Sequence, residues 1–185
     1  MLTIQIDSRE KAKAIQKIIS EFDAQEVKYY TSKLYVGDYM SLDNPRLIVD
    51  RKQNLQEICG NVCQQHKRFK AELIRAQEAG IQLIILCEHS NRIKTIDDVR
   101  SWENPRIKAW EKEIKKLAGF NNKYSVGSAI NYLKQNKIRF RKSPMTGNQI
   151  ADIMETMTEK YGVQWLFCDK AHTGQMIVEL LSREV

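Results

Sequence analysis

Acidic side chains stand at the ends of three predicted strands in the first third of the chain. They are Asp7, Asp38 and Asp50, and Lys52 follows Asp50 by two positions. Residues i and i+2 of a strand face the same side of a sheet, so Asp50 and Lys52 are expected to point into one site. Carboxylates at a strand edge form an oxygen site of the kind that Mg²⁺ prefers, and a nearby lysine can help to activate water beside a phosphate. The pattern therefore indicates hydrolysis of a phosphodiester.

The elements that must position these residues alternate between strands and helices. Alternating apolar residues predict a first strand that ends at Asp7, and a helix over about 9–22 follows it. Further strands are predicted at 27–30, 33–36, 39–42, 47–52, 81–87, 138–141 and 165–168. Further helices are predicted from about 53 to Gly80 and at 108–117, 125–135, 146–161 and 173–181. Such alternation predicts an α/β three-layer sandwich with a mixed central sheet.

The basic residues are concentrated in the middle of the chain. Residues 101–145 contain 11 of the 30 Lys and Arg residues but only 3 of the 23 acids, and Trp102, Trp110, Phe120 and Tyr124 lie among them. Clustered bases interleaved with aromatic side chains are typical of surfaces that bind a nucleic-acid backbone and stack on exposed bases. The alternative is an ordinary solvated basic face whose aromatic residues turn into the core.

Length and composition exclude several classes of protein. The 185 residues have 42% apolar side chains and a formal charge of +7, which excludes general disorder. No apolar run approaches the ~20 residues of a membrane span, and acids within the first ten positions exclude a signal peptide. We therefore expect a cytoplasmic protein, in a bacterial or phage-infected cell, with reduced cysteines. Cys59, Cys63 and His66 have helical spacing that suits zinc, but core thiols are the stronger interpretation.

Three ordered motifs surround the acidic residues. They are IDSRE at 6–10, VGDY at 36–39 and LIVDRK at 47–52, followed by Arg68-Phe69 and by LIILCE at 83–88. This series resembles the nuclease domain of XPF-type structure-specific endonucleases, a PD-(D/E)xK group with a restriction-endonuclease-like fold. The resemblance implies a single nuclease domain over 1–185, with a basic helical insertion at about 91–144. The size is similar to short stand-alone members from phages and mobile elements.

The resemblance also implies roles for individual residues. Asp38 and Asp50 would bind Mg²⁺ or Mn²⁺, and Asp7 would complete the metal site or, with Glu10, hold its waters or a basic partner. Lys52 would position the attacking water or stabilise the charged phosphorane, whereas Arg51 would contact phosphate or brace the acids. Strand alternation makes Arg51 face away from Asp50 and Lys52. The predicted nucleic-acid contacts are Arg9, Lys67, Arg68, Lys108, Lys112, Lys115, Lys116, Arg139, Arg141 and Lys142.

Two positions depart from the family pattern. Asp50 stands where the family has Glu, and Gln56 stands where it has a further Asp, which leaves the number of metals open. The leading hypothesis is a metal-dependent endonuclease that cleaves flaps or junctions in DNA during repair, recombination or phage DNA processing. One alternative is a catalytically silent nuclease fold that binds DNA or a partner protein. Another is a basic scaffold for an acidic partner. The stripe that contains Met154, Met157 and Met176 is interpreted as core, and the resemblance also allows part of it to form a homodimer face.

Overall fold

A mixed sheet of six strands forms the centre of the molecule. The computed structural model describes residues 2–183. The strand order is β2-β1-β3-β4-β5-β6. β3 runs antiparallel to both of its neighbours, and the other pairs are parallel. The strands are β1 (Thr3–Asp7), β2 (Lys28–Ser32), β3 (Tyr39–Ser41), β4 (Leu47–Lys52), β5 (Gln82–Glu88) and β6 (Gln164–Cys168). The prediction of an α/β fold with a mixed sheet is confirmed.

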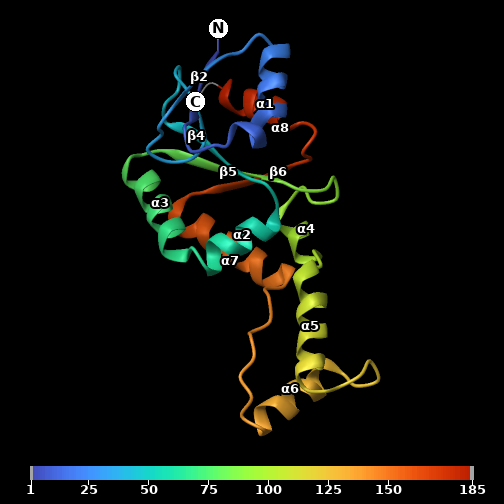
Figure 1. Ribbon diagram of the computed structural model, residues 1–185. Coiled ribbons are helices and arrows are strands. Elements are labelled where there is room, and N and C mark those ends of the chain that lie inside the picture. Colours follow the sequence, from blue (N-terminus) through green and yellow to red (C-terminus); the bar gives the residue numbers. More distant parts are fainter. Residues whose placement is uncertain (1, 184–185) are drawn as a thin grey trace.

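Helices cover both faces of this sheet, as Figure 1 shows. α1 (Ala12–Ala24) and α8 (Thr173–Leu181) lie on one face. α2 (Leu55–Cys63), α3 (His66–Glu78) and α7 (Gly147–Tyr161) lie on the other. Successive residues of β4 enter the two cores in turn, because strand side chains alternate: Val49 packs under α1 and α8, and Ile48 packs under α2, α3 and α7. Both faces of the central strand are therefore buried, as its apolar sequence predicts.

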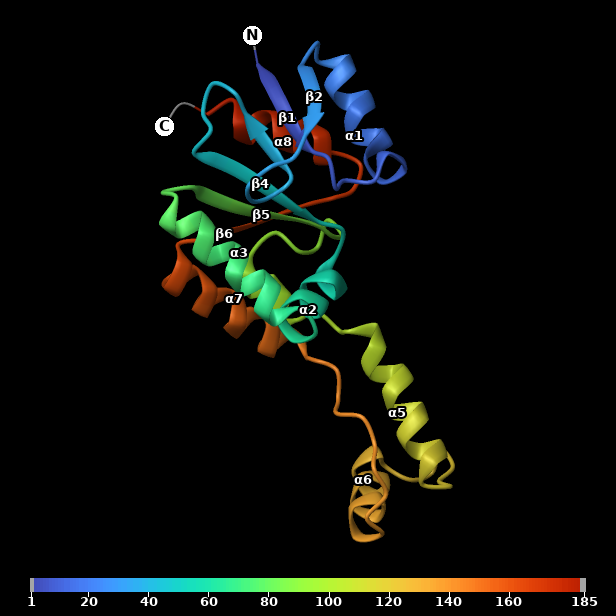
Figure 2. The ribbon, with the colours of Figure 1, turned by 60° about the vertical axis from the view of Figure 1, so that its left-hand side comes forward.

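Two further helices extend away from the sheet (Figure 2). α4 (Ile96–Arg100) still packs on α7, and its Val99 belongs to the main core. α5 (Pro105–Leu117) and α6 (Val126–Gln135) instead share a small apolar cluster of their own, centred on Ile114, Ala118, Ala129 and Leu133. We call residues 105–142 the basic hairpin. It occupies the centre of the predicted insertion and contains a core too small for a domain.

Three predicted elements differ in the structure. Residues 33–36 form no strand, because Leu34 N donates its hydrogen bond to the Asp7 side chain instead of to a neighbouring strand. Residues 138–141 form no strand either, since Lys137 has a positive φ of 55° and Ile138 N closes the end of α6 by bonding to Leu133 O. The long helix predicted up to Gly80 is divided into α2 and α3 at Gln64–Gln65.

The methionine stripe of α7 belongs to the core. Met154 and Met157 are buried among the side chains beneath the sheet. The interpretation of the stripe as core is therefore confirmed for these two residues, and they are not available as a dimer face. A homodimer through another surface stays a prediction. Within residues 2–183, no helix combines the length and the apolar character that crossing a membrane requires.

Candidate active site

Asp50 and Lys52 meet on one face of β4. The strand continues through both residues, so their side chains point to the same side, as predicted. Lys52 Nζ donates a hydrogen bond of 2.8 Å to Asp50 Oδ1 and lies 2.7 Å from Oδ2. Only 3% of Asp50 and 7% of Lys52 is exposed. Lys52 Nζ also lies 5.6 Å from the centre of the Phe69 ring, which α3 supplies from below. The fold thus holds a buried ion pair at the strand end.

The turn before β3 brings Asp38 to this pair. Gly37 makes the turn with a φ of +64°, and a Cβ there would come within 2.5 Å of the Ile48 side chain, so only glycine fits. Asp38 is then fixed to the strand: its N–H donates to Val49 O, and its Oδ2 accepts from Arg51 N at 2.8 Å. The backbone of β4 therefore positions the second carboxylate directly.

Electrostatics couple the three side chains. Burial, followed by the charge of Asp50, raises the pKa of Asp38 well above its ordinary value. Burial alone would lower the pKa of Lys52, but the carboxylates of Asp50 and Asp38 raise it above its ordinary value instead. Lys52 therefore stays an ammonium ion at neutral pH. A protonated lysine cannot accept a proton from water, so its geometry suits stabilisation of negative charge.

A divalent cation fits the donors of this cluster. Asp50 Oδ2 is buried and accepts no hydrogen bond from the described residues, although Lys52 Nζ is near it. Two adjacent carboxylates that repel each other gain from a cation that neutralises both. Residues 2–183 contain no group of three or more His, Cys, Asp or Glu side chains arranged to hold a metal. Water or phosphate oxygens would have to supply the remaining positions around Mg²⁺ or Mn²⁺.

Asp7 lies outside the carboxylate pair. Its Oδ1 accepts from Arg9 N and Nε, both at 2.7 Å, and its Oδ2 accepts from Arg9 Nη2 and from Leu34 N. Four donors thus occupy both oxygens of a fully buried residue, which leaves the expected metal-ligand role of Asp7 without geometric support. Its backbone N–H instead donates to Asp38 O at 2.8 Å. Asp7 therefore positions Asp38, and Arg9, predicted to contact phosphate, is held in an ion pair.

The hydrogen bonds to Asp7 predict a pH-dependent contribution to stability. Burial alone would raise the pKa of Asp7, but the hydrogen bonds from Arg9 and Leu34 lower it below its ordinary value of 3.8. A carboxyl group whose pKa is lower in the folded state than in the unfolded state stabilises the fold at pH values above its unfolded-state pKa. This contribution is lost as the pH falls through its folded-state pKa. We expect Asp7→Asn to lower the free energy of unfolding by about 1–3 kcal/mol at pH 7. Urea unfolding at pH 7 and pH 3 should show this difference shrinking in acid.

The matched control for this prediction is the exposed Asp43. Asp43→Asn removes the same charge from the surface and should change stability by less than about 0.5 kcal/mol. An Asp7→Asn protein that is as stable as the wild type at pH 7 would contradict a stabilising role for the hydrogen bonds that the Asp7 carboxylate accepts.

Arg51 lies on the opposite face of β4, as strand alternation predicts. Its Nη2 and Nε bond to Glu10 Oε2 at 2.9 and 3.1 Å, and its Nη1 bonds to Glu88 Oε1 at 3.0 Å. Tyr39 donates its hydroxyl to the same Glu10 oxygen at 3.2 Å. The Arg51 side chain is 2% exposed, so of its two predicted roles the geometry favours bracing the acids. The pKa of Arg51, which burial alone would lower, is raised by Glu10, and the guanidinium keeps its charge.

Sequence reasoning gave no role to Glu88 or Glu57. Glu88 ends the apolar run of β5, and an acid that closes a buried strand is a signal that was available. Glu57, near the start of α2, accepts a hydrogen bond from Gln53 N at 2.8 Å. Against the lowering effect of burial, its carboxylate also helps to raise the pKa of Lys52, by less than the charges of Asp50 and Asp38 do. An acid therefore stands near Lys52 even though Gln56 replaces the family's Asp.

The predicted phosphate contacts lie mainly on exposed surfaces. Lys67 and Arg68 are exposed at the start of α3. In the basic hairpin, Lys115 is half-buried. The other predicted contacts there are exposed, namely Lys108, Lys112, Lys116, Arg139, Arg141 and Lys142. Lys108, Lys112 and Lys116 follow one another at four-residue intervals on α5, which places them along one side of that helix.

The aromatic residues of the central segment divide between two environments. Trp110 and Phe120 pack against the apolar cluster of the hairpin, and Trp102 packs against the main core. Tyr124 and Tyr132 remain exposed beside Phe120. Trp102, Trp110 and Phe120 therefore turn into the apolar clusters, as the alternative interpretation predicts, whereas the two tyrosines are accessible for stacking.

The cysteines form no metal site in the described residues. Cys59 and Cys87 are buried and Cys63 is exposed, and all are free thiols. Burial raises the pKa of Cys59 to about 11, as expected for a thiol in a core. The interpretation as core thiols is therefore the better one for Cys59 and Cys87.

The sheet, its two helical layers and the Asp38–Asp50–Lys52 cluster define a restriction-endonuclease-like α/β domain. The model of the ERCC4 domain matches residues 6–180, so the chain belongs to the ERCC4 domain family. The resemblance to XPF-type nuclease domains is thereby confirmed. None of the curated proteins matches the sequence.

Solved structures show the same fold. XPF from Aeropyrum pernix is 17% identical, with a TM-score of 0.54, over 97% of this chain and 63% of that chain. XPF from Aeropyrum pernix in complex with DNA is 15% identical, with a TM-score of 0.55, over 98% of this chain and 64% of that chain. The chain thus spans somewhat less than two thirds of these relatives.

Proposed function

We propose that this protein is a Mg²⁺- or Mn²⁺-dependent endonuclease that hydrolyses phosphodiester bonds in branched DNA. The observation that carries the proposal is the buried cluster of Asp38, Asp50 and Lys52 at the end of β4. A fold gains little from burying two carboxylates beside each other, and such costly arrangements are concentrated at functional sites. Membership of the ERCC4 domain family supports the same reaction.

Asp38 and Asp50 would hold the metal ion. When bound, the ion supplies positive charge that polarises the scissile phosphate and favours hydroxide formation from water at neutral pH. Lys52 would place its ammonium against the charge that develops on the phosphate during in-line attack, and a 5′-phosphate would be left. The backbone N–H of Asp7 donates a hydrogen bond to Asp38 O. The hydrogen bonds of Arg51 to neighbouring acids fix the opposite face of β4. These residues position the cluster without touching the substrate.

Branched or flapped DNA is the substrate class that we propose. The support consists of the family, the relative whose structure is a complex with DNA, and the basic hairpin that extends from the domain. The process would be repair, recombination or phage DNA processing. The second candidate is a silent DNA-binding module, which the missing charge at Gln56 favours.

Cleavage of labelled flap, fork, four-way-junction and linear duplex DNA tests the proposal. Cuts in branched substrates that depend on a divalent metal support the endonuclease. Retarded migration of DNA without cleavage under every metal supports the silent module. Absence of any binding at low salt contradicts both and favours the basic scaffold, because electrostatic binding to phosphates is strongest there.

The lysine stripe of α5 predicts a salt-dependent contribution to DNA binding. We expect replacement of Lys108, Lys112 and Lys116 by Ala to weaken fork binding about tenfold or more. Each lost phosphate contact should also reduce the slope of log affinity against log salt by roughly 0.9. Fluorescence titration of a labelled fork at several salt concentrations measures both quantities.

A charge-matched control removes three exposed lysines from the other end of the molecule. Lys13, Lys17 and Lys28 lie on or beside α1 and β2, far from the hairpin in both views of the ribbon. Their replacement by Ala should leave the salt slope almost unchanged. Equal effects of the two triple variants would show that net charge, and not the hairpin surface, governs binding.

A further inference from the structure

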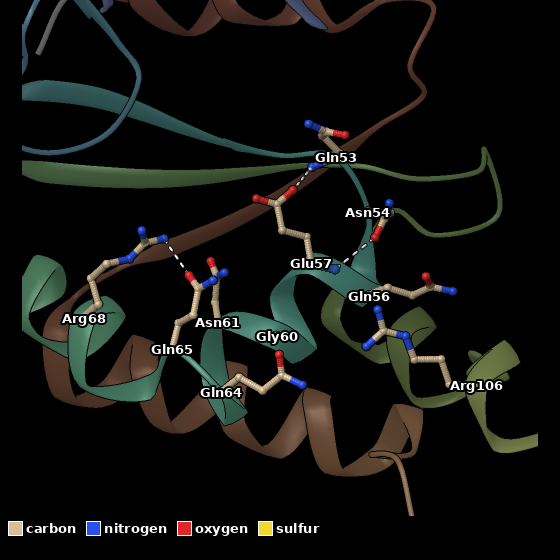
Figure 3. A pocket seen from close by; sticks show the side chains of 10 residues that line it. All are labelled: Gln53, Asn54, Gln56, Glu57, Gly60, Asn61, Gln64, Gln65, Arg68 and Arg106. Carbon is tan, nitrogen blue, oxygen red and sulfur yellow. Dashed lines mark hydrogen bonds between the residues drawn. The ribbon is translucent and has the colours of Figure 1, made fainter. Parts of the chain in front are cut away.

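A polar pocket lies beside the candidate active site. It has a volume of about 460 Å³, within the ~300–1,000 Å³ typical of small-molecule sites. α2 and the first turn of α3 form most of its wall, and α5 contributes one arginine at the edge (Figure 3). The lining residues are Gln53, Asn54, Gln56, Glu57, Gly60, Asn61, Gln64, Gln65, Arg68 and Arg106.

Side-chain amides dominate this lining. Two of them already have partners: Asn54 Oδ1 caps α2 by accepting from Glu57 N, and Gln65 Oε1 accepts from Arg68 Nη2. The side chains of Gln53, Gln56 and Gln64 make no hydrogen bond within the described residues, and they line the open space. An amide offers a donor and an acceptor side by side, as the edge of a nucleobase does.

Asn61 is the most informative residue of the pocket. Only 6% of it is exposed, yet its side chain makes no hydrogen bond with any described residue. Within the described residues, the fully enclosed side-chain atoms that lack a hydrogen-bond partner belong to Asp50 and Glu88, so the Asn61 amide is open to the pocket and can be hydrated there. Asn61 lines the pocket, and its side-chain amide points into the pocket in Figure 3. A ligand that enters the pocket would replace water with its own hydrogen bonds to this amide.

Two lining residues, Gln53 and Glu57, connect the pocket to the carboxylate cluster. Gln53 directly follows Lys52 in the chain, and Glu57 bonds to Gln53 N from within the pocket. The lining contains no aromatic residue, so a base would be held by its edge and not by stacking. Arg68 and Arg106 stand at the rim, where positive charge suits the flanking phosphates.

We propose that this amide pocket accepts one unpaired nucleobase next to the scissile phosphate and hydrogen-bonds its edge through Asn61. The inference rests on the proposed function, which places the scissile phosphate at Asp38 and Asp50. It adds that recognition includes a flipped or splayed base and not branch shape alone. Phosphate by itself would need only donors, whereas the pocket offers donors and acceptors together.

Gly60 provides a direct way to fill the pocket. A Cβ at Gly60 would meet no atom within 4 Å, and the residue lies inside α2. Gly60→Ala should therefore fold at least as well as the wild type, because alanine favours helices. Gly60→Met would project a long side chain into the space. Asn61→Leu removes the amide at nearly constant volume and serves as an independent second variant.

The test measures binding of fluorescent forked DNA in EDTA, so that it does not depend on cleavage. A single abasic nucleotide is moved along the unpaired arm, one position at a time. For the wild type, we expect one position at which the missing base weakens binding about fivefold or more. Gly60→Met and Asn61→Leu should bind the intact fork about as weakly as the wild type binds the fork with that abasic nucleotide. For these two variants, no abasic position should weaken binding further.

The outcomes separate this inference from the proposed function. Binding that is indifferent to every abasic position, or a position effect that persists in both pocket variants, overturns the pocket, whatever cleavage shows. A position effect that both variants abolish supports the pocket even if no metal produces cleavage. Thermal unfolding of each variant shows whether it is folded, and if Gly60→Met is not, Asn61→Leu decides alone.

Discussion

Asp50→Asn should reduce the rate of DNA cleavage by about a thousandfold or more. The loss of activity follows because charge stabilisation by a bound metal is worth several kcal/mol, and each ~1.4 kcal/mol changes a rate tenfold. Asn has nearly the shape of Asp, so the loss of activity reports the carboxylate charge of Asp50.

Two measurements on the same preparations check this expectation. Single-turnover cleavage of a labelled fork gives the rate, and thermal unfolding with and without Mg²⁺ or Mn²⁺ gives the stability. A cation that binds only the folded protein raises the unfolding temperature, so it should stabilise the wild type and not Asp50→Asn. Asp43→Asn, which changes an exposed aspartate, should behave as the wild type. Cleavage by Asp50→Asn at the wild-type rate would exclude Asp50 from the reaction.

Arg51→Met should destabilise the protein by about 3–5 kcal/mol. Removal of one partner from a buried ion pair leaves the other charge uncompensated. Here two acids lose their partner at once, since Arg51 bonds to both Glu10 and Glu88. Glu88 is almost fully buried, and its Oε2 already has no hydrogen-bond partner among the described residues. Urea unfolding in EDTA measures the loss.

A second substitution shows whether the network is the cause. Glu88→Gln added to Arg51→Met removes one stranded charge and should recover part of the lost stability. Arg46→Met is the matched control, because Arg46 is exposed, its side chain makes no hydrogen bond or ion pair within the described residues, and its removal should cost about 0.5 kcal/mol or less. An Arg51→Met protein with normal stability but weaker DNA binding would contradict the bracing role. That result would favour the phosphate contact that the family resemblance allowed.

The local part of the site was predictable from the sequence. Alternation along β4 placed Asp50 and Lys52 on one face and Arg51 on the other, and the structure has this arrangement. The prediction succeeded because a strand has a period of two residues, whatever the rest of the fold does. Asp38 was likewise expected at a strand end, and the turn at Gly37 brings it to β4.

The roles that depend on contacts between distant segments were not predictable in this way. Asp7 was expected to bind metal, but Arg9 and the distant Leu34 N occupy its oxygens. The same hydrogen bond from Leu34 explains why residues 33–36 form no strand. Glu88 reaches Arg51 across neighbouring strands, and no local pattern marks such a contact. Periodicity predicts which face a side chain takes, whereas its partner is determined by the packing of the sheet.

Metal-dependent cleavage by the wild-type protein tests the central claim most directly. Labelled fork DNA is incubated under single-turnover conditions with Mg²⁺, with Mn²⁺ and with EDTA, and the ends of the products are mapped. The cluster of Asp38, Asp50 and Lys52 predicts cuts near the branch that leave 5′-phosphates in Mg²⁺ or Mn²⁺ and that disappear in EDTA. Tight binding of the fork without cleavage in either metal, or equal cleavage in EDTA, would contradict a metal-dependent endonuclease.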